Sequence, residues 1–397
     1  MLFPFKSSGL APLLSELDRW RDKLDLRSTL PRSWTGRLRR DLEAEAVAAS
    51  TAMEGVAVTV DEVRRILAGD KLHEVAEEDQ DLVRGYRDAM GFVLRRADDA
   101  GFRWSRELIV ALHDRILAGK HALEAGRFRT TRSRLVDAST GAEVFLPPRA
   151  EEVGSLVDEA CDRLERVREH PALAAAWIHV AVAAIHPFRD GNGRSCRVLA
   201  SLAMHRGGFK RREFTSLEEW WGRHRASYYA AFRCLGKRFS RTSDVSPFVR
   251  LHLQAQLSQV RALDLREEIE RRIWTVVEDL ALERRMDRRI ANALWDAFFG
   301  RDVTAGYFRS LTDVSPATAT QDLALASAAG LLLPEGQRKG RVYRAGRVLV
   351  QEVARAVGVE LDGQEPLDSA RGRIVHSLGD RLAVRAPHRR RSSAPSR

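Results

Sequence analysis

The sequence has few cysteines and no long apolar run. Its three cysteines, Cys161, Cys196 and Cys234, lie far apart and form no CxxC pair, which supports neither a zinc ribbon nor a disulfide framework. No stretch reaches the roughly 18 apolar residues of a membrane span, since the most apolar one, residues 171–185, is shorter and contains His179. The first residues, MLFPFKSSG, lack the apolar core of a secretory signal. We therefore expect a cytoplasmic protein with reduced thiols.

The composition is that of a globular protein with an excess of positive charge. Of the 397 residues, 44% are hydrophobic and 30% are charged, a balance typical of globular rather than disordered chains. The length favours two or three domains. The formal net charge of +11 predicts contact with something anionic, and nucleotide, nucleic acid and an acidic protein surface all remain open.

Apolar residues recur every three or four positions near the N-terminus. Residues 10–24 and 34–55 both show this spacing, which predicts two helices. Thr59 and Glu62 then form a T-x-x-E capping box, a pattern typical of a helix start. We therefore interpret residues 1–100 as a helical N-terminal lobe.

One segment of the next region departs from the helical pattern. Residues 127–148 alternate between polar and apolar side chains and contain a turn near 139–141, so they predict a β-hairpin. The rest of 101–240 keeps helical spacing. The expected fold class is therefore mainly α, with one hairpin in the core over 101–240.

The C-terminal third has a different pattern of elements. A long helix over 246–272 is expected to form a connector within 241–286. Residues 287–350 predict three helices followed by two short strands, with Ser315 as N-cap and Pro316 as first residue of the third helix. This order is typical of a winged helix-turn-helix.

Basic residues gather at two places in this third. Arg338, Lys339 and Arg341 lie at the tip between the two strands, where they suit DNA, but a solvated face of a packing or dimerisation unit fits equally well. Residues 351–397 are loosely patterned, and the last seventeen hold six arginines and no acid. We expect 351–397 to form a basic, disordered tail.

The most informative stretch is HPFRDGNGRSCR, residues 186–197. It resembles the signature of the Fic family, H-x-F-x-[DE]-G-N-G-R-x-x-R, and lies between two predicted helices. All eight specified positions match: His186, Phe188, Asp190, Gly191, Asn192, Gly193, Arg194 and Arg197.

The residue types of this stretch suit a phosphate. Gly191 and Gly193 allow close approach of the backbone, and the N–H groups at the start of the following helix point at an anion. Arg194 and Arg197 stand three residues apart, hence on one helix face, where two guanidiniums suit the β- and γ-phosphates of a nucleotide.

The remaining positions suit a metal and a proton transfer. Asp190 is a hard oxygen ligand fit for Mg²⁺ beside phosphate oxygens, and Asn192 can donate to the α-phosphate. His186 can take the proton of an attacking hydroxyl. Phe188 is expected to anchor the loop in the core. Four other histidines lack metal-ligand spacing and are expected as core or surface residues: His113, His179, His205 and His224.

The resemblance covers about half of the chain, from residue 43 to 235, and implies an activity. It implies transfer of AMP from ATP to a Ser, Thr or Tyr hydroxyl of a target protein, with His186 as base, Asp190 as metal ligand and Asn192 among the phosphate contacts. It also implies that the hairpin over 135–145 is a flap that holds a segment of the target as an added strand.

A second element belongs to the same resemblance. The string STAMEG, from Ser50 to Gly55, fits the inhibitory pattern [ST]-x-x-x-E-[GN] of the family. The Glu54 carboxylate is expected to pair with Arg197 in place of the γ-phosphate, which makes 1–100 a regulatory lobe. An ordinary polar helix end is the alternative for this short string.

Several functional alternatives stay open. The same cradle can transfer another phosphate-linked group if the nucleotide binds reversed, and removal of AMP by the same site is a further option. A DNA-binding regulator whose core senses nucleotide is an alternative from a different class. Association of two copies is also left open, and the sequence names no target.

Overall fold

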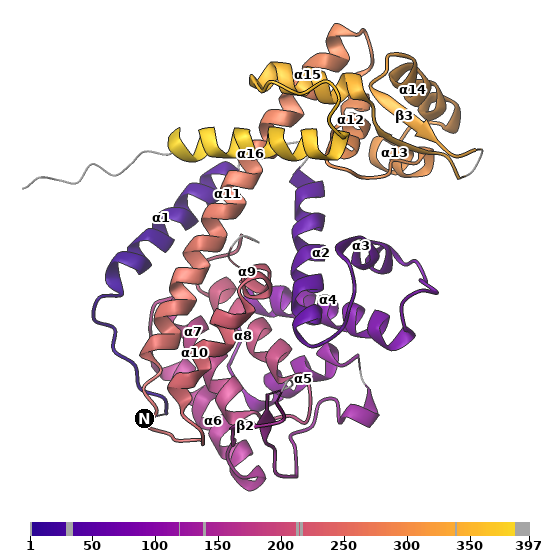
Figure 1. Ribbon diagram of the computed structural model, residues 1–397. Helices are drawn as coiled ribbons and strands as arrows, with labels where there is room; N and C mark the ends of the chain where they lie inside the picture. Colours follow the sequence, from indigo (N-terminus) through magenta and orange to yellow (C-terminus); the bar gives the residue numbers. More distant parts are fainter. Residues whose placement is uncertain are drawn as a thin grey trace, which may run out of the picture. The chain divides into compact units, whose positions relative to one another are not determined.

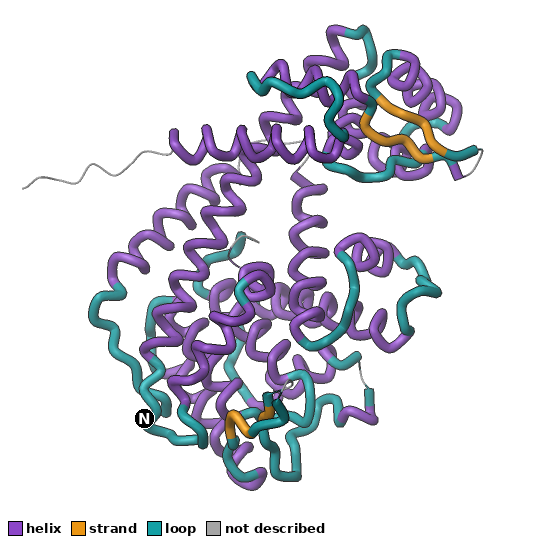
Figure 2. The backbone as a smooth tube through the Cα atoms, viewed as in Figure 1, coloured by secondary structure: helices purple, strands orange, loops and turns teal. Residues whose placement is uncertain are grey.

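The computed structural model describes residues 2–28, 35–118, 120–137, 140–211, 214, 217–337 and 340–385. The chain forms two compact units, Met1–Arg261 and Ala262–Arg397. Figures 1 and 2 show that helices dominate and that strands occur only as two short hairpins within the described residues. The boundary between the units falls within the long helix α11 (Ser246–Glu283), which begins where the connector helix was predicted but runs past residue 272.

The first unit is a helical assembly around two central helices, α7 and α8. α7 begins at Pro171, and the His170 ring caps it by accepting a hydrogen bond from the Ala172 amide at 3.1 Å. Every residue over 175–182 is buried, because this helix is apolar on all sides.

The helices of the first unit are α1 (Ala11–Ser28), α2 (Thr35–Met53), α3 (Val60–Ala68), α4 (Glu77–Ala97), α5 (Arg106–Ile116), η1 (His121–Leu123), α6 (Ala150–Arg166), α7 (Pro171–Ile185), α8 (Asn192–Arg206), α9 (Leu217–Arg223), α10 (Arg225–Ala231), η3 (Phe232–Leu235) and the first part of α11.

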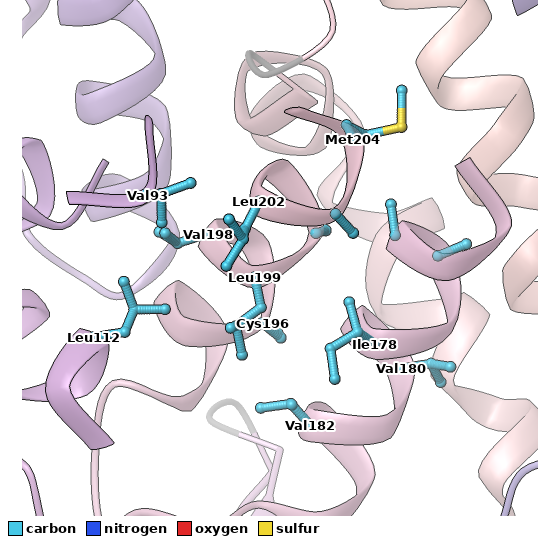
Figure 3. Packing of buried hydrophobic residues seen from close by; sticks show 14 of the residues in the cluster. Val93, Leu112, Ile178, Val180, Val182, Cys196, Val198, Leu199, Leu202 and Met204 are labelled. Carbon is cyan, nitrogen blue, oxygen red and sulfur yellow. The ribbon is translucent and has the colours of Figure 1, made fainter. Parts of the chain in front are cut away.

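The core between α7 and α8 is made of aliphatic side chains. Figure 3 shows Ile178 and Val182 of α7 facing Cys196 and Leu199 of α8, and all four are almost fully buried. Close packing of this kind gives the ends of the two helices a rigid support. The loop that joins them, residues 186–191, is therefore attached at both ends to a rigid, closely packed helix.

The predicted N-terminal helix and hairpin are present in the first unit. The Thr59 and Glu62 capping box forms in both directions, with the Thr59 amide 2.7 Å from the Glu62 carboxylate. Strands β1 (Leu135–Val136) and β2 (Glu143–Phe145) pair antiparallel, with Leu135 opposite Phe145. The predicted turn residue Ser139 lies outside the described residues.

The second unit contains the helices and the hairpin predicted over 287–350. The Ser315 hydroxyl caps α14 by accepting a hydrogen bond from the Thr318 amide at 3.1 Å. Val303 and Tyr343 exchange two backbone hydrogen bonds, which ties the loop before α13 to the hairpin. Arg338 and Lys339 of the tip lie outside the described residues. The elements are η4 (Arg288–Ile290), α12 (Ala291–Phe298), α13 (Ala305–Thr312), α14 (Pro316–Ala328), β3 (Leu332–Glu335), β4 (Val342–Ala345), α15 (Arg347–Val357) and α16 (Leu367–Arg385). The winged helix itself stays a prediction.

The expectation of a disordered tail from residue 351 is wrong for its first part. α15 and α16 cover most of 347–385. In α16, Ala370, Ile374 and Leu378 are buried. They are spaced four residues apart, so they form one apolar helix face that the surrounding charges hide from a reading of composition. Residues 386–397 lie outside the described part of the chain.

Within the described part of the chain, no helix combines the length and the hydropathy needed to cross a membrane.

Candidate active site

The predicted signature forms the junction between α7 and α8. His186 is the C-terminal cap of α7 and has a left-handed backbone, with φ 50° and ψ 60°. Gly191 caps the start of α8, also left-handed with φ 73°. A left-handed conformation costs about 1 kcal/mol for a residue with a Cβ. Contacts from the rest of the protein must therefore hold His186 in place.

Arg129 supplies these contacts, and sequence analysis did not identify it. Its Nε donates to the His186 carbonyl at 2.8 Å and its Nη2 to the Pro148 carbonyl at 2.7 Å, while Nη1 donates to the Thr131 carbonyl at 3.0 Å. The Arg129 amide donates to the Pro187 carbonyl at 2.9 Å. The buried guanidinium thus satisfies carbonyls at the end of α7 and ties the loop to the segments that flank the hairpin.

Two further side chains fix the middle of the loop. The Asn192 amide accepts from the Phe188 N–H at 3.0 Å and donates to the Phe188 carbonyl at 2.9 Å. The His113 ring stacks on the Phe188 ring with centroids 3.6 Å apart. Its Nδ1 accepts from the Gly126 amide at 3.0 Å, which leaves Nε2 to donate to the Asp190 carbonyl at 2.9 Å. Phe188 is fully buried, as predicted.

Arg194 is a buried cation with unused donors. Its side chain is 2% exposed, and its closest carboxylate oxygen is Asp190 Oδ2, at 3.6 Å from Nη2. Among the described residues, Arg194 Nε and Nη1 have no hydrogen-bond partner. A buried guanidinium without acceptors is costly, so this arrangement fits an anionic ligand that supplies them.

Arg197 is also buried, but its guanidinium is paired. Nε donates to the Ser50 hydroxyl at 2.9 Å, and Nη2 donates to the Ser50 carbonyl at 3.1 Å and to Glu54 Oε1 at 2.8 Å. The same Glu54 oxygen lies 2.3 Å from where a Cβ on Gly193 would be. The carboxylate therefore rests directly on the glycine backbone at the start of α8, where the sequence predicts a phosphate.

The predicted residues around this contact have different parts in it. Ser50 belongs to the last turn of α2, and Glu54 follows that helix directly. Gly55 has φ 89° and makes the turn that ends the segment. The Glu54 contact with Arg197 is the one expected of the string STAMEG. The Ser50 contacts with Arg197 were not predicted, and Gly55 acts on the backbone alone.

The His186 ring is largely buried and neutral. Burial and, to a smaller extent, the nearby Arg129 charge lower its pKa to about 4, against the opposing effects of a hydrogen bond to the Ala183 carbonyl and of the carboxylates of Glu54 and Asp190. One ring nitrogen is occupied by the Ala183 carbonyl, which leaves the other to accept a proton. The ring is therefore neutral at physiological pH.

The Asp190 carboxylate suits a divalent cation whose other ligands are water and phosphate oxygens. Its Oδ1 accepts from the Gly191 amide at 2.6 Å, and its side chain is 45% exposed. No group of three or more carboxylate, histidine or cysteine side chains in the described ranges is arranged to hold a metal by itself. Mg²⁺ is commonly held by one carboxylate together with water and phosphate oxygens, so the Asp190 carboxylate suits it.

Comparison with known proteins agrees with this geometry. The family model described as "Fic/DOC family" matches residues 103–204, a range that contains the hairpin and the whole loop from His186 to Arg197. Residues 103–204 form a Fic/DOC domain. Ser50 and Glu54 lie outside it in the sequence, although they contact its Arg197.

Curated relatives and solved structures extend the comparison beyond the Fic/DOC domain. A protein adenylyltransferase Fic from Nematostella vectensis is 29% identical over 205 residues, which are 50% of this chain and 45% of that protein. One from Caenorhabditis briggsae is 35% identical over 146 residues, or 36% of this chain and 25% of that protein. The chain thus spans less than half the length of these relatives.

Two solved structures share the fold. A Fic family protein from Desulfovibrio desulfuricans superposes with a TM-score of 0.55 at 20% identity, covering 87% of this chain and 99% of that one. A Fic domain containing signaling protein from Bacteroides thetaiotaomicron gives 0.52 at 17% identity, covering 63% and 94%. At such identities the likeness concerns the fold alone.

Replacing Arg129 should weaken the Fic/DOC domain. Arg129→Met removes the donors that satisfy several buried carbonyls, so we expect a loss of about 2–4 kcal/mol in the free energy of unfolding and a less well ordered loop. Arg127→Met is the matched control, because the Arg127 side chain is exposed two residues away. Denaturant unfolding of both variants tests the difference; equal stabilities would mean that Arg129 is not needed to hold the loop.

Buried neutral histidines should make the first unit sensitive to acid. Burial lowers the pKa of His252 to about 3 and that of His113 to about 4. As pH falls from about 6.5 toward 4, the unfolded chain binds protons that the folded unit does not, so stability decreases by about 1.4 kcal/mol per pH unit for each such histidine. His252→Phe should reduce that slope by one histidine's share, and the exposed His73→Gln should not. Unfolding midpoints across this pH range measure the slope; an unchanged slope in His252→Phe would contradict the assignment.

Proposed function

We propose that the protein transfers AMP from ATP to a hydroxyl group of a target protein. The observation that carries this proposal is the start of α8, where the buried Arg194 has unused donors and is near the charges of Asp190 and Arg197, after a loop that begins at the neutral His186. A polyphosphate supplies the acceptors and the negative charge that this arrangement lacks. The curated relatives that carry the name protein adenylyltransferase support the same reaction.

The chemistry follows from the residues in this loop. A Ser, Thr or Tyr hydroxyl of the target attacks the α-phosphorus of ATP, the new O–P bond forms, and the bond from that phosphorus to the pyrophosphate oxygen breaks. The hydroxyl proton passes to the free nitrogen of His186, which is neutral and able to take it. Arg194 and Arg197 stabilise the charge on the departing pyrophosphate.

Backbone and amide groups hold the nucleotide in line for this attack. The left-handed Gly191 opens α8 so that its first amides face the phosphates. The Asn192 amide uses one Nδ2 proton on the Phe188 carbonyl and keeps a second for the α-phosphate. Mg²⁺ held at Asp190, when bound, neutralises phosphate charge.

We further propose that Glu54 inhibits this reaction. Its carboxylate occupies Arg197 Nη2 at 2.8 Å and covers Gly193. The γ-phosphate needs the same guanidinium, so the two anions exclude each other. ATP then binds in a pose in which the α-phosphorus is not aligned with the incoming hydroxyl.

The hairpin suits a role in holding the target. β1 and β2 are short, and Val136 and Val144 are each 48% exposed, so the hairpin offers apolar contacts to an added strand. The cytoplasmic location and the association of two copies remain predictions.

Incubation with ATP labelled at the α- or the γ-phosphate tests the proposal. We expect α-label, and not γ-label, to become covalently attached to protein when His186 is unchanged. Attachment of γ-label alone would instead indicate phosphoryl transfer with a reversed nucleotide, and loss of attached α-label on longer incubation would indicate AMP removal at the same site.

DNA binding by residues 287–350 is a second candidate function. A short turn joins α13 to α14, and α14 exposes Thr320 and Gln321, whose side chains can hydrogen-bond base edges. α14 contains no Lys or Arg, so contacts with the phosphate backbone would depend on Arg341 and the other basic residues of the tip.

The salt dependence of duplex binding tests this second candidate. If this segment reads DNA, affinity should fall steeply with salt, and Arg341→Gln should lower the slope of log K against log salt by about one. Arg344→Gln is a control with a smaller expected effect, because Arg344 is already paired with Asp302 and Glu335. Weak, salt-independent binding would leave the segment as a structural module.

A further inference from the structure

A small cavity lies beside Arg197 in the core of the first unit, and the proposed reaction does not use it. It has room for about one water molecule, and its walls come from α7, α8, α9 and α11. The residues that matter here are His179, Arg197, Glu218, His252 and Gln256. Among the described residues that line the cavity, Arg197 is the one arginine or lysine and Glu218 the one carboxylate.

Glu218 is an unusual residue to find in this core. Its side chain is 1% exposed. The Tyr86 hydroxyl donates to its Oε1 at 2.7 Å, while Oε2 has no hydrogen-bond partner among the described residues. A buried carboxylate is stable as an anion only next to a positive charge. Arg197, across the same cavity, supplies that charge.

Arg197 donates three hydrogen bonds to one short segment. They go to the Ser50 hydroxyl, the Ser50 carbonyl and the Glu54 carboxylate, while the Tyr228 hydroxyl is a further, uncharged partner. If Glu54 withdraws, the buried guanidinium loses the one carboxylate that it touches. Among the described residues that line the cavity with it, Glu218 is then the remaining carboxylate.

We propose that Glu218 is a positioning residue that serves as a second, permanent counter-ion of Arg197. It acts through the cavity from α9, with its carboxylate oriented by the Tyr86 hydroxyl. Its charge keeps the guanidinium buried and in place during the interval between the departure of Glu54 and the arrival of the γ-phosphate. This inference rests on the proposed function, in which Arg197 changes from one anion to the other.

The two charges support each other. Burial raises the pKa of Glu218, and a backbone hydrogen bond, the hydrogen bond from Tyr86 and the Arg197 charge act against that shift. Without Arg197, an ionised Glu218 would have no compensating charge in the cavity. Removing the Glu218 charge should therefore destabilise the first unit when position 197 carries a positive charge, and stabilise it when position 197 is neutral.

A set of charge-removing variants of the full chain tests the proposal. Hydrogen exchange of the core amides of α8, measured without nucleotide, reports the opening of the first unit alone. We expect Glu218→Gln to lower protection, and to do so by a further factor of roughly ten when Glu54→Gln is also present, because Arg197 then lacks both carboxylates. In an Arg197→Met background, we expect Glu218→Gln to raise protection instead. Arg197→Gln is a second neutral background with a polar side chain.

Tyr86→Phe is the matched control. It removes the hydrogen bond to Glu218 but no charge, so its loss of protection should be the same with and without Arg197. If Glu218→Gln behaves in the same way as Tyr86→Phe, with equal effects in both backgrounds, Glu218 is only a packed polar residue and the proposal is wrong. Since no nucleotide is present, this outcome is independent of whether AMP is transferred.

Discussion

Glu54→Gly should raise the rate of AMP transfer by about 10- to 100-fold. The Glu54 carboxylate forms a charge-assisted hydrogen bond with the buried Arg197 at 2.8 Å, and such bonds contribute about 1.5–3 kcal/mol, which corresponds to this range. Removing it frees the guanidinium for the γ-phosphate, so the α-phosphorus aligns with the incoming hydroxyl. The gain should be in rate more than in affinity for ATP. Transfer of α-labelled phosphate to protein measures it.

Matched variants separate release of inhibition from loosening of the fold. Glu54 lies just after the last residue of α2, so glycine at this position does not interrupt a helix. Glu54→Gln keeps the size of the side chain and should activate to a smaller extent, and Ser50→Ala should act weakly because Glu54 stays on Arg197. The double variant Glu54→Gly with His186→Ala should be inactive. Wild-type activity in Glu54→Gly would mean that Ser50 to Gly55 is an ordinary helix end.

Local patterns in the sequence predict much of this fold because their causes are local. Capping by Thr59 and by Ser315 needs only neighbouring residues, and both helices begin where these residues indicate. The hairpin over 135–145 follows from its alternation and its turn. α16 was missed because its helix depends on packing of Ala370, Ile374 and Leu378 within a charged segment, and packing is a property of the tertiary structure.

The residues of the site likewise fall into two groups: those that a local sequence pattern identifies and those that only the folded structure identifies. A contiguous signature identifies the loop from His186 to Arg197, since its residues follow one another in the sequence. No sequence motif identifies Arg129, His113 or Glu218. Each acts on a carbonyl or a charge that is distant in the sequence and that only folding brings near. They are identified in the structure because each is a charged or histidine side chain that is buried.

His186→Ala should lower transfer by about 10²- to 10⁴-fold, the usual contribution of a general base. The Arg194 and Arg197 side chains and the backbone of α8 stay in place, so nucleotide binding should be nearly unchanged. Arg197→Ala should behave differently and weaken productive ATP binding itself. Single-turnover transfer and equilibrium binding of ATP, both measured in a Glu54→Gly background, separate the two effects.

The left-handed backbone at position 186 decides which control is needed. Alanine is strained at φ 50°, so a loss of activity in His186→Ala alone could come from a displaced loop. Asparagine tolerates this conformation better than other residues with a side chain and cannot accept the hydroxyl proton. His186→Asn should therefore bind ATP as the parent does and still transfer 10²-fold more slowly or worse, by the same estimate for a general base. Near-normal turnover in His186→Asn would show that another group removes the proton.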